Sequence, residues 1–119
     1  MDRTVLIVDD HAGFRALARK LLAAEGWEVV GEAGDGAEAL TEARRLHPEL
    51  VLLDLNLPDG SGLDVAERLA ATDPAPQVVL TSTHDEDELH ELARARRATG
   101  FVPQRLLSGA RLEAVLSGR

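Results

Sequence analysis

Short apolar segments and amphipathic helical segments alternate five times along the chain, and this alternation constrains the fold more than any other feature. The apolar segments, each typical of a strand, are Thr4–Asp9, Trp27–Glu32, Leu50–Asp54, Gln77–Ser82 and Gly100–Pro103. Three of them are nearly continuous runs of valine, leucine and isoleucine, as expected of parallel strands that are covered on both faces. The second segment is more polar, which suits a strand at the edge of a sheet.

Leucine and alanine recur at helical spacing between these strands. The expected helices lie around Phe14–Leu22, Ala39–Leu46, Val65–Ala70 and Asp85–Arg97, and after the N-cap residue Ser108. Strand–helix alternation of this kind predicts a doubly wound, five-stranded parallel sheet in the order 2-1-3-4-5, a flavodoxin-like three-layer α/β/α fold. No internal repeat or interdomain linker interrupts the pattern, so residues 1–119 are expected to form a single domain.

Composition excludes several classes of function. Acidic residues outnumber basic ones 21 to 13, which gives a net charge of −8, and such a surface repels nucleic-acid backbones. Cysteine is absent, which excludes disulfides and thiolate chemistry. No apolar run approaches the roughly 20 residues that span a bilayer, and no signal peptide is evident. We therefore expect a cytoplasmic domain without direct contact to nucleic acid or membrane.

Acidic side chains end two strands that the topology makes neighbours. Asp9 and Asp10 follow the first strand, and Asp54 ends the third. Ligands of doubly wound folds bind beyond the carboxyl ends of the strands, at this switch point. Each carboxylate alone could simply solvate or cap a loop. Three converging carboxylates repel one another, so they must be protonated, solvated or neutralised by a cation. A hard divalent ion such as Mg²⁺ is the natural solution.

The loop after Asp54 extends to Gly62 and has the composition of a tight turn. Pro58 presets a turn, while Gly60 and Gly62 permit positive φ or a close backbone approach. Many strand–helix loops look like this one, so the loop is informative only because it starts at the third carboxylate.

Together these segments closely resemble the receiver domain of bacterial two-component response regulators, over essentially the whole chain. The motifs that carry the resemblance are VLIVDDH (Val5–His11), LVLLDLNLPDGSGLDV (Leu50–Val65), VVLTS (Val78–Ser82) and GFVPQ (Gly100–Gln104). Each motif alone is weak, but the ordered set is highly specific.

The resemblance implies that Asp54 is the phosphoacceptor, which takes a phosphoryl group from a sensor histidine kinase. It also implies that Asp10 and Asp54 bind Mg²⁺ together with the backbone carbonyl of Asn56, and that Asp9 assists through water. A receiver is not an enzyme in the usual sense, because it catalyses only its own phosphorylation and dephosphorylation.

The resemblance also supplies a switch. Counting back from the last strand places Ser82 at the family's switch hydroxyl, and a shift of one residue would place Thr81 there instead. Phe101 falls at the aromatic switch position. The output face would comprise Leu89–Arg97, Phe101 and Leu106–Leu116, and would bind a downstream protein, an output domain or a second copy of the chain.

One residue departs from the family pattern. The family has a lysine at the end of strand five, where this chain has Gln104. The only lysine is Lys20, in the first helix, and strand alternation would point Arg105 to the opposite face. A glutamine can donate a hydrogen bond but carries no charge, and neutral hydrogen bonds are weaker than charged ones. We therefore expect metal binding to survive and phosphorylation, or its structural readout, to be weakened.

Two histidines lie beside the expected site. His11 follows the acid pair, but the acidic surroundings and the absence of a second imidazole argue against a role as a metal ligand. By resemblance, His84 would line the entrance of the hydrolytic water, opposite Asn56.

Other functions are consistent with parts of this sequence. The glutamine favours a phosphorylation-independent interaction module with a vestigial acidic pocket. A flavin carrier would need a hydroxyl- and glycine-rich phosphate loop after strand one, where this chain has Asp9-Asp10-His11. A phosphatase of the aspartate-nucleophile class would need an acid two residues after its nucleophile, where this chain has Asn56. Both residue patterns argue against these enzymes. Whether the chain acts alone or within a longer regulator, and which kinase it serves, is not encoded in these residues.

Overall fold

The computed structural model describes residues 3–83 and 87–117. Its elements are β1 (Thr4–Val8), α1 (Ala12–Ala24), β2 (Glu28–Ala33), α2 (Gly36–Leu46), β3 (Leu50–Asp54), β4 (Asn56–Leu57), β5 (Gly60–Ser61), α3 (Gly62–Ala70), β6 (Gln77–Ser82), α4 (Asp87–Ala95), β7 (Gly100–Pro103), the 3₁₀ turn η1 (Gln104–Leu106) and α5 (Gly109–Leu116). All five predicted strands are present, as β1, β2, β3, β6 and β7.

These five strands form one parallel sheet in the order β2-β1-β3-β6-β7. This is the predicted order, since β6 and β7 are the fourth and fifth long strands of the chain. The register pairs Val8 of β1 with Leu53 of β3, so the residues that follow them emerge at the same edge of the sheet. The partly exposed strand β2 pairs with β1 on the side away from β3 and forms an edge of the sheet, as its polar sequence predicts.

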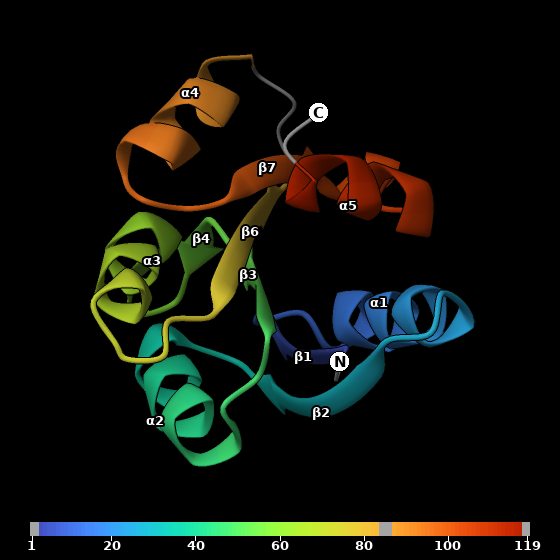
Figure 1. Ribbon diagram of the computed structural model, residues 1–119, viewed down its shortest axis with the longest axis horizontal. Helices are drawn as coiled ribbons and strands as arrows, with labels where there is room; N and C mark the ends of the chain where they lie inside the picture. Colours follow the sequence, from blue (N-terminus) through green and yellow to red (C-terminus); the bar gives the residue numbers. More distant parts are fainter. Residues whose placement is uncertain (1–2, 84–86, 118–119) are drawn as a thin grey trace.

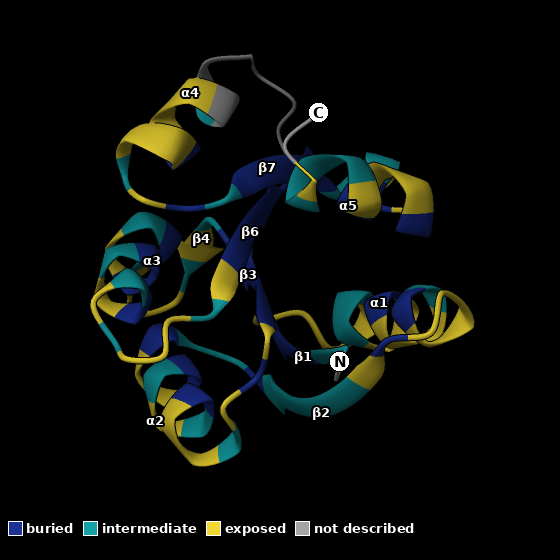
Figure 2. Ribbon diagram, viewed as in Figure 1, coloured by how far each residue is buried: buried dark blue, intermediate teal, exposed yellow. Residues whose placement is uncertain are grey.

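Helices cover both faces of the sheet. Figure 1 shows α1 and α5 on one side and α2, α3 and α4 on the other. Each face has its own apolar core, because successive side chains of a strand point to opposite faces. Leu6, Val8 and Leu53 pack towards α2, α3 and α4, whereas Ile7 and Leu52 pack towards α1 and α5. Figure 2 shows that the inner strands are buried and that exposed residues concentrate on the outer helix faces.

Side-chain caps begin three helices in the described part of the chain. The carboxylate of Asp35 accepts the Glu38 N–H at the start of α2, and Ser61 accepts the Leu63 N–H at the start of α3. The predicted cap Ser108 accepts the Arg111 N–H at the start of α5. Such caps satisfy backbone N–H groups that have no partner within the helix.

The structure differs from the sequence prediction at several points, among them the end of β1, which is Val8 rather than Asp9, and the end of β2, which is Ala33 rather than Glu32. Trp27 lies just outside β2, buried in the core of the α1 and α5 face, with the Arg3 guanidinium 4.5 Å from its ring centre. The helix α4 ends at Ala95 rather than Arg97, since Arg97 has a φ of 68° that no right-handed helix can continue. The loop after β3 contains a small antiparallel hairpin, β4–β5, which its sequence did not indicate.

Within the described residues, the structure contains no helix of the length and apolar character needed to cross a bilayer.

Candidate functional site

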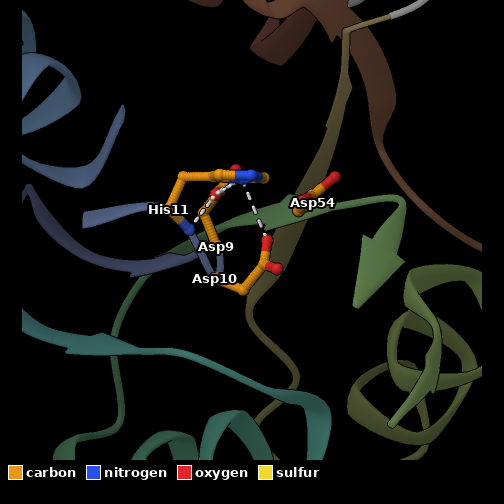
Figure 3. A group of neighbouring side chains, drawn as sticks. All are labelled: Asp9, Asp10, His11 and Asp54. Carbon is orange, nitrogen blue, oxygen red and sulfur yellow. Dashed lines mark hydrogen bonds and ion pairs between the residues drawn. The ribbon is translucent and has the colours of Figure 1, made fainter. Parts of the chain in front are cut away.

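The carboxylates predicted to converge do so at the carboxyl ends of β1 and β3. Asp9 and Asp10 follow β1, and Asp54 is the last residue of β3. One ligand atom from each of these residues, together with one from His11, lies within 4.8 Å of all the others (Figure 3). The neighbouring positions of β1 and β3 in the sheet produce this cluster from residues that are distant in the chain.

Asp9 is completely buried and is held through both carboxylate oxygens. Its Oδ1 accepts the His11 backbone N–H at 2.8 Å, and its Oδ2 accepts Nε2–H of Gln104 at 2.9 Å. The Asp9 carbonyl accepts a hydrogen bond from Arg15 Nη1 at 2.6 Å, and Arg15 in turn pairs with Glu32 of β2. The carboxylate of Asp9 is thus held by the His11 backbone N–H and by Gln104 of η1, while Arg15 of α1 holds the backbone carbonyl.

Asp54 is only 6% exposed, and its Oδ1 accepts the Asn56 backbone N–H at 3.1 Å. Burial is the largest influence on this carboxyl and raises its pKa from 3.8 to about 6. The Asn56 N–H acts in the opposite direction, while the charges of Asp9 and Asp10 add to the increase. An ionised Asp54 is therefore costly unless a cation neutralises the cluster.

His11, which was expected near the site, joins the cluster. Its Nδ1 lies 3.2 Å from Asp9 Oδ1 and 3.0 Å from Asp10 Oδ1, and Figure 3 shows its ring turned back towards both carboxylates. Its position directly after the acid pair was the available signal. His84, the other histidine expected near the site, lies outside the described residues.

Gln104 reaches the cluster by a route that strand geometry does not predict. The strand β7 ends at Pro103, and Gln104 begins the 3₁₀ turn η1. The side-chain amide therefore turns to Asp9. The same turn invalidates the argument that set Arg105 aside, because side-chain alternation between opposite faces holds only within a strand.

The two hydroxyl residues at the end of β6 lie on opposite faces of the sheet. Thr81 pairs in register with Asp54 and shares its face, whereas Ser82 shares a face with Phe101. All four of these residues are buried. Thr81 Oγ1 has no hydrogen-bond partner within residues 3–83 and 87–117, a feature that sequence alone did not reveal.

The loop that leads away from Asp54 is anchored at two points. Asp59 accepts the N–H groups of Gly36 and Ala37 at 2.8 and 3.0 Å, and these hydrogen bonds lower the pKa of its carboxyl. Gly62 packs so closely on β3 that a Cβ there would lie 2.2 Å from the carbonyl oxygen of Asp54. The packing of Gly62 on β3 is the close backbone approach that this glycine predicted. The contact of Asp59 with α2 was not predicted.

Comparison with known proteins gives a consistent result. The family described as the response regulator receiver domain matches residues 5–115. Transcriptional regulatory protein PdtaR of Mycobacterium tuberculosis is 42% identical over 100 residues, which cover 84% of this chain and 48% of PdtaR. Chemotaxis protein CheY of Thermotoga maritima is 34% identical over 102 residues, which cover 86% of this chain and 85% of CheY.

The solved structures agree. A two-component response regulator of the LuxR family from Aurantimonas sp. SI85-9A1 superposes with a TM-score of 0.86 at 30% identity, covering 100% of this chain and 88% of that one. The chain spans about half the length of PdtaR. From the fold, the cluster at the switch point and the match over residues 5–115, the chain belongs to the response regulator receiver domains, the signalling modules of bacterial two-component systems.

Proposed function

We propose that this receiver domain accepts a phosphoryl group on Asp54 and relays the resulting change to a partner. The observation that carries the proposal is the burial of Asp54 beside two further carboxylates at the switch point of the sheet. That arrangement raises the pKa of Asp54 to about 6 and makes the ionised pocket dependent on a cation.

The residues present fit a divalent cation. Asp9, Asp10 and Asp54 offer carboxylate oxygens within 4.8 Å of one another, and hard cations such as Mg²⁺ prefer oxygen ligands of this kind. We assign Asp10, Asp54 and the backbone carbonyl of Asn56 as direct ligands and Asp9 as a residue that acts through water. The bound ion would offset the charge on the phosphoryl oxygens during transfer.

The transfer itself requires little from the protein beyond positioning. One carboxylate oxygen of Asp54 forms a bond to the phosphorus of a phosphohistidine on the sensor kinase, and the phosphorus–nitrogen bond of the donor breaks. The donor imidazole leaves with that electron pair and takes up a proton, and Asp54 becomes an acyl phosphate. The Asn56 N–H, 3.1 Å from Asp54 Oδ1, orients the attacking carboxylate.

A switch from Asp54 to the α4–β7–α5 face completes the proposed function. Ser82 lies at the end of β6 on the same face as Phe101, which is fully buried in this structure. We assign Ser82 as the switch hydroxyl and Phe101 as the aromatic switch, with α4, β7 and α5 forming the output face. A downstream protein, an output domain or a second copy of the chain would bind there.

Phosphotransfer from a small donor tests the proposal. Wild type, Asp54→Asn and Asp73→Asn are incubated with acetyl phosphate and Mg²⁺, and each product is analysed by intact mass. We expect a gain of one phosphoryl group in the wild type and in Asp73→Asn, which carries its change on an exposed residue. EDTA and the Asp54 substitution should each abolish the gain. An unmodified wild type, or equal labelling of Asp54→Asn, would refute the assignment.

The second candidate function is a phosphorylation-independent interaction module. The observation that favours it is the engagement of Gln104 with Asp9, which leaves an uncharged group where the family has a lysine. Beryllofluoride with Mg²⁺, a mimic of the phosphoryl group, separates the two functions. A receiver that responds to phosphorylation should bind it saturably, with amide shifts near Asp54 and Phe101. An interaction module should show an unchanged spectrum.

A further inference from the structure

We propose that His11 is a fourth ligand of the cation in this pocket and makes the site favour transition ions such as Mn²⁺ and Zn²⁺ relative to Mg²⁺. The inference rests on the proposed function, in that it takes the acidic cluster to hold a divalent cation. It adds a nitrogen donor to a pocket whose other ligands are oxygen atoms.

The geometry of His11 suits a ligand. Two ligands side by side on one ion, each 2.0–2.2 Å from it, are separated by about 3.0–3.4 Å. Nδ1 of His11 lies 3.0 Å from the oxygen of Asp10, within that range, and 3.2 Å from the oxygen of Asp9, the residue assigned to act through water. In the metal-free pocket these are hydrogen-bond or ion-pair contacts of the ring nitrogen, and a bound ion would replace any proton held between the groups. Ligands on opposite sides of such an ion are about 4.3 Å apart. The 4.8 Å spread of the four residues therefore needs to contract by only about half an ångström.

The local backbone places the imidazole there. His11 is the N-cap residue of α1 in extended conformation, and its own N–H is bound to Asp9 Oδ1. This short loop turns the ring back over the acid pair rather than along α1 (Figure 3). The side chain is 73% exposed and does not cap α1. The start of the helix therefore does not depend on where the imidazole ring lies.

The chemistry of the donors sets the metal preference. Mg²⁺ prefers oxygen ligands, whereas an imidazole nitrogen is a good ligand for Zn²⁺ and other first-row transition ions. Carboxylates also suit Mn²⁺. Adding one imidazole to the carboxylates of Asp10 and Asp54 and the carbonyl of Asn56 should thus raise the affinity for Mn²⁺ and Zn²⁺ while leaving that for Mg²⁺ nearly unchanged.

Calorimetric titration of the metal-free protein with Mg²⁺, Mn²⁺ and Zn²⁺ in turn tests the proposal. The variants are His11→Ala and His47→Asn, the latter a control that removes another exposed histidine at a left-handed position that asparagine tolerates. We expect His11→Ala to reduce the Mn²⁺ and Zn²⁺ affinities at least about tenfold and the Mg²⁺ affinity less than about threefold. His47→Asn should reproduce the wild-type ratios.

A spectroscopic measurement locates the contact directly. In long-range ¹H–¹⁵N spectra of the wild type, saturating Zn²⁺ should shift the Nδ1 resonance of His11 and leave that of His47 in place. Equal losses for all three ions in His11→Ala, or an unmoved His11 Nδ1, would overturn the proposal.

The two proposals fail separately. If the metal ratios do not change and Asp54 is still phosphorylated with Mg²⁺, the ligand role of His11 is wrong and the phosphoacceptor role stands. If the wild type binds none of the three ions saturably, the pocket is not a cation site and both the metal assignment and the role of His11 are refuted.

Discussion

The titration of Asp54 should be visible in the stability of the metal-free protein. Its folded-state pKa of about 6 exceeds the ordinary value of 3.8, so between these values the folded state binds more protons than the unfolded state. Stability contributed by this group is therefore lost as the pH rises from about 4 to about 6. Asp54→Asn removes the free-energy cost of ionising this buried carboxyl. We therefore expect the free energy of unfolding of Asp54→Asn to increase by about 2 kcal/mol relative to that of wild type between pH 4 and pH 7.5.

Urea unfolding in EDTA at the two pH values measures this gain. Asp59→Asn is the control of opposite sign, because the N–H groups of Gly36 and Ala37 lower the pKa of Asp59. That carboxylate contributes stability at neutral pH, which disappears as the pH falls below the pKa of the folded state. A pH-independent difference between Asp54→Asn and wild type would show that burial does not destabilise the ionised carboxylate.

We expect the residue at position 104 to determine how strongly phosphorylation of Asp54 is coupled to the active conformation. A charged donor contributes about 1.5–3 kcal/mol, against about 0.5–1.5 kcal/mol for a neutral one. Replacing Gln104 with lysine should therefore strengthen the coupling by about 1–2 kcal/mol. This corresponds to a shift of roughly 5–30-fold in the ratio of active to inactive conformations of the phosphorylated domain.

The measurement is the population of the activated state with beryllofluoride, together with the lifetime of the acyl phosphate. Gln77→Lys is the matched control, since it places the same charge on an exposed residue at the amino end of β6. Unchanged population and lifetime in Gln104→Lys would mean that the residue at this position acts only on Asp9, through the hydrogen bond seen here.

At the scale of elements, the junction of β3 and α3 determines where Asp54 sits. Gly62 begins α3 and leaves no room for a Cβ beside the Asp54 carbonyl. Gly62→Ala should cost about 1–3 kcal/mol of stability, because strand and helix must separate. Gly13→Ala is the control, since open space surrounds that glycine in α1, and it should stabilise by about 0.5–1 kcal/mol. Urea unfolding compares the two, and equal effects would contradict the packing argument.

Sequence patterns predict the elements well where a single physical rule decides. The bounds of β3, β6 and β7 follow from short apolar runs that end at or just before a polar residue, and those strands are as predicted. The hairpin β4–β5 escaped prediction because two residues per strand carry no periodicity. The end of α4 depends on the left-handed conformation of Arg97, which residue type does not indicate.

The candidate site was predictable where strand order determines it, and not where it depends on tertiary contacts. The meeting of Asp9, Asp10 and Asp54 follows from strand order alone. The partner of Gln104 depends on the 3₁₀ turn after β7, and the partner of Asp59 depends on how closely α2 approaches the loop. Both are tertiary contacts with no signature in the local sequence.

At the scale of the whole molecule, cation binding should stabilise the fold through one site rather than through its charge as a whole. The chain carries a net charge of −8, so any cation reduces general repulsion to some degree. A cation that binds only the folded state adds about 2.7 kcal/mol at a hundredfold excess over its Kd. For a domain of this size that corresponds to an increase of roughly 10 °C in Tm.

Thermal unfolding with Mg²⁺, and with NaCl at matched ionic strength, separates the two effects. Asp10→Asn and Asp73→Asn each remove one negative charge from the chain, but only Asp10 belongs to the cluster at the switch point. We expect Mg²⁺ to raise the Tm of wild type and Asp73→Asn by similar amounts, and that of Asp10→Asn by less than half as much. Equal increases in all three proteins would assign the effect to net charge, because a localised site loses affinity only when one of its own oxygens is removed.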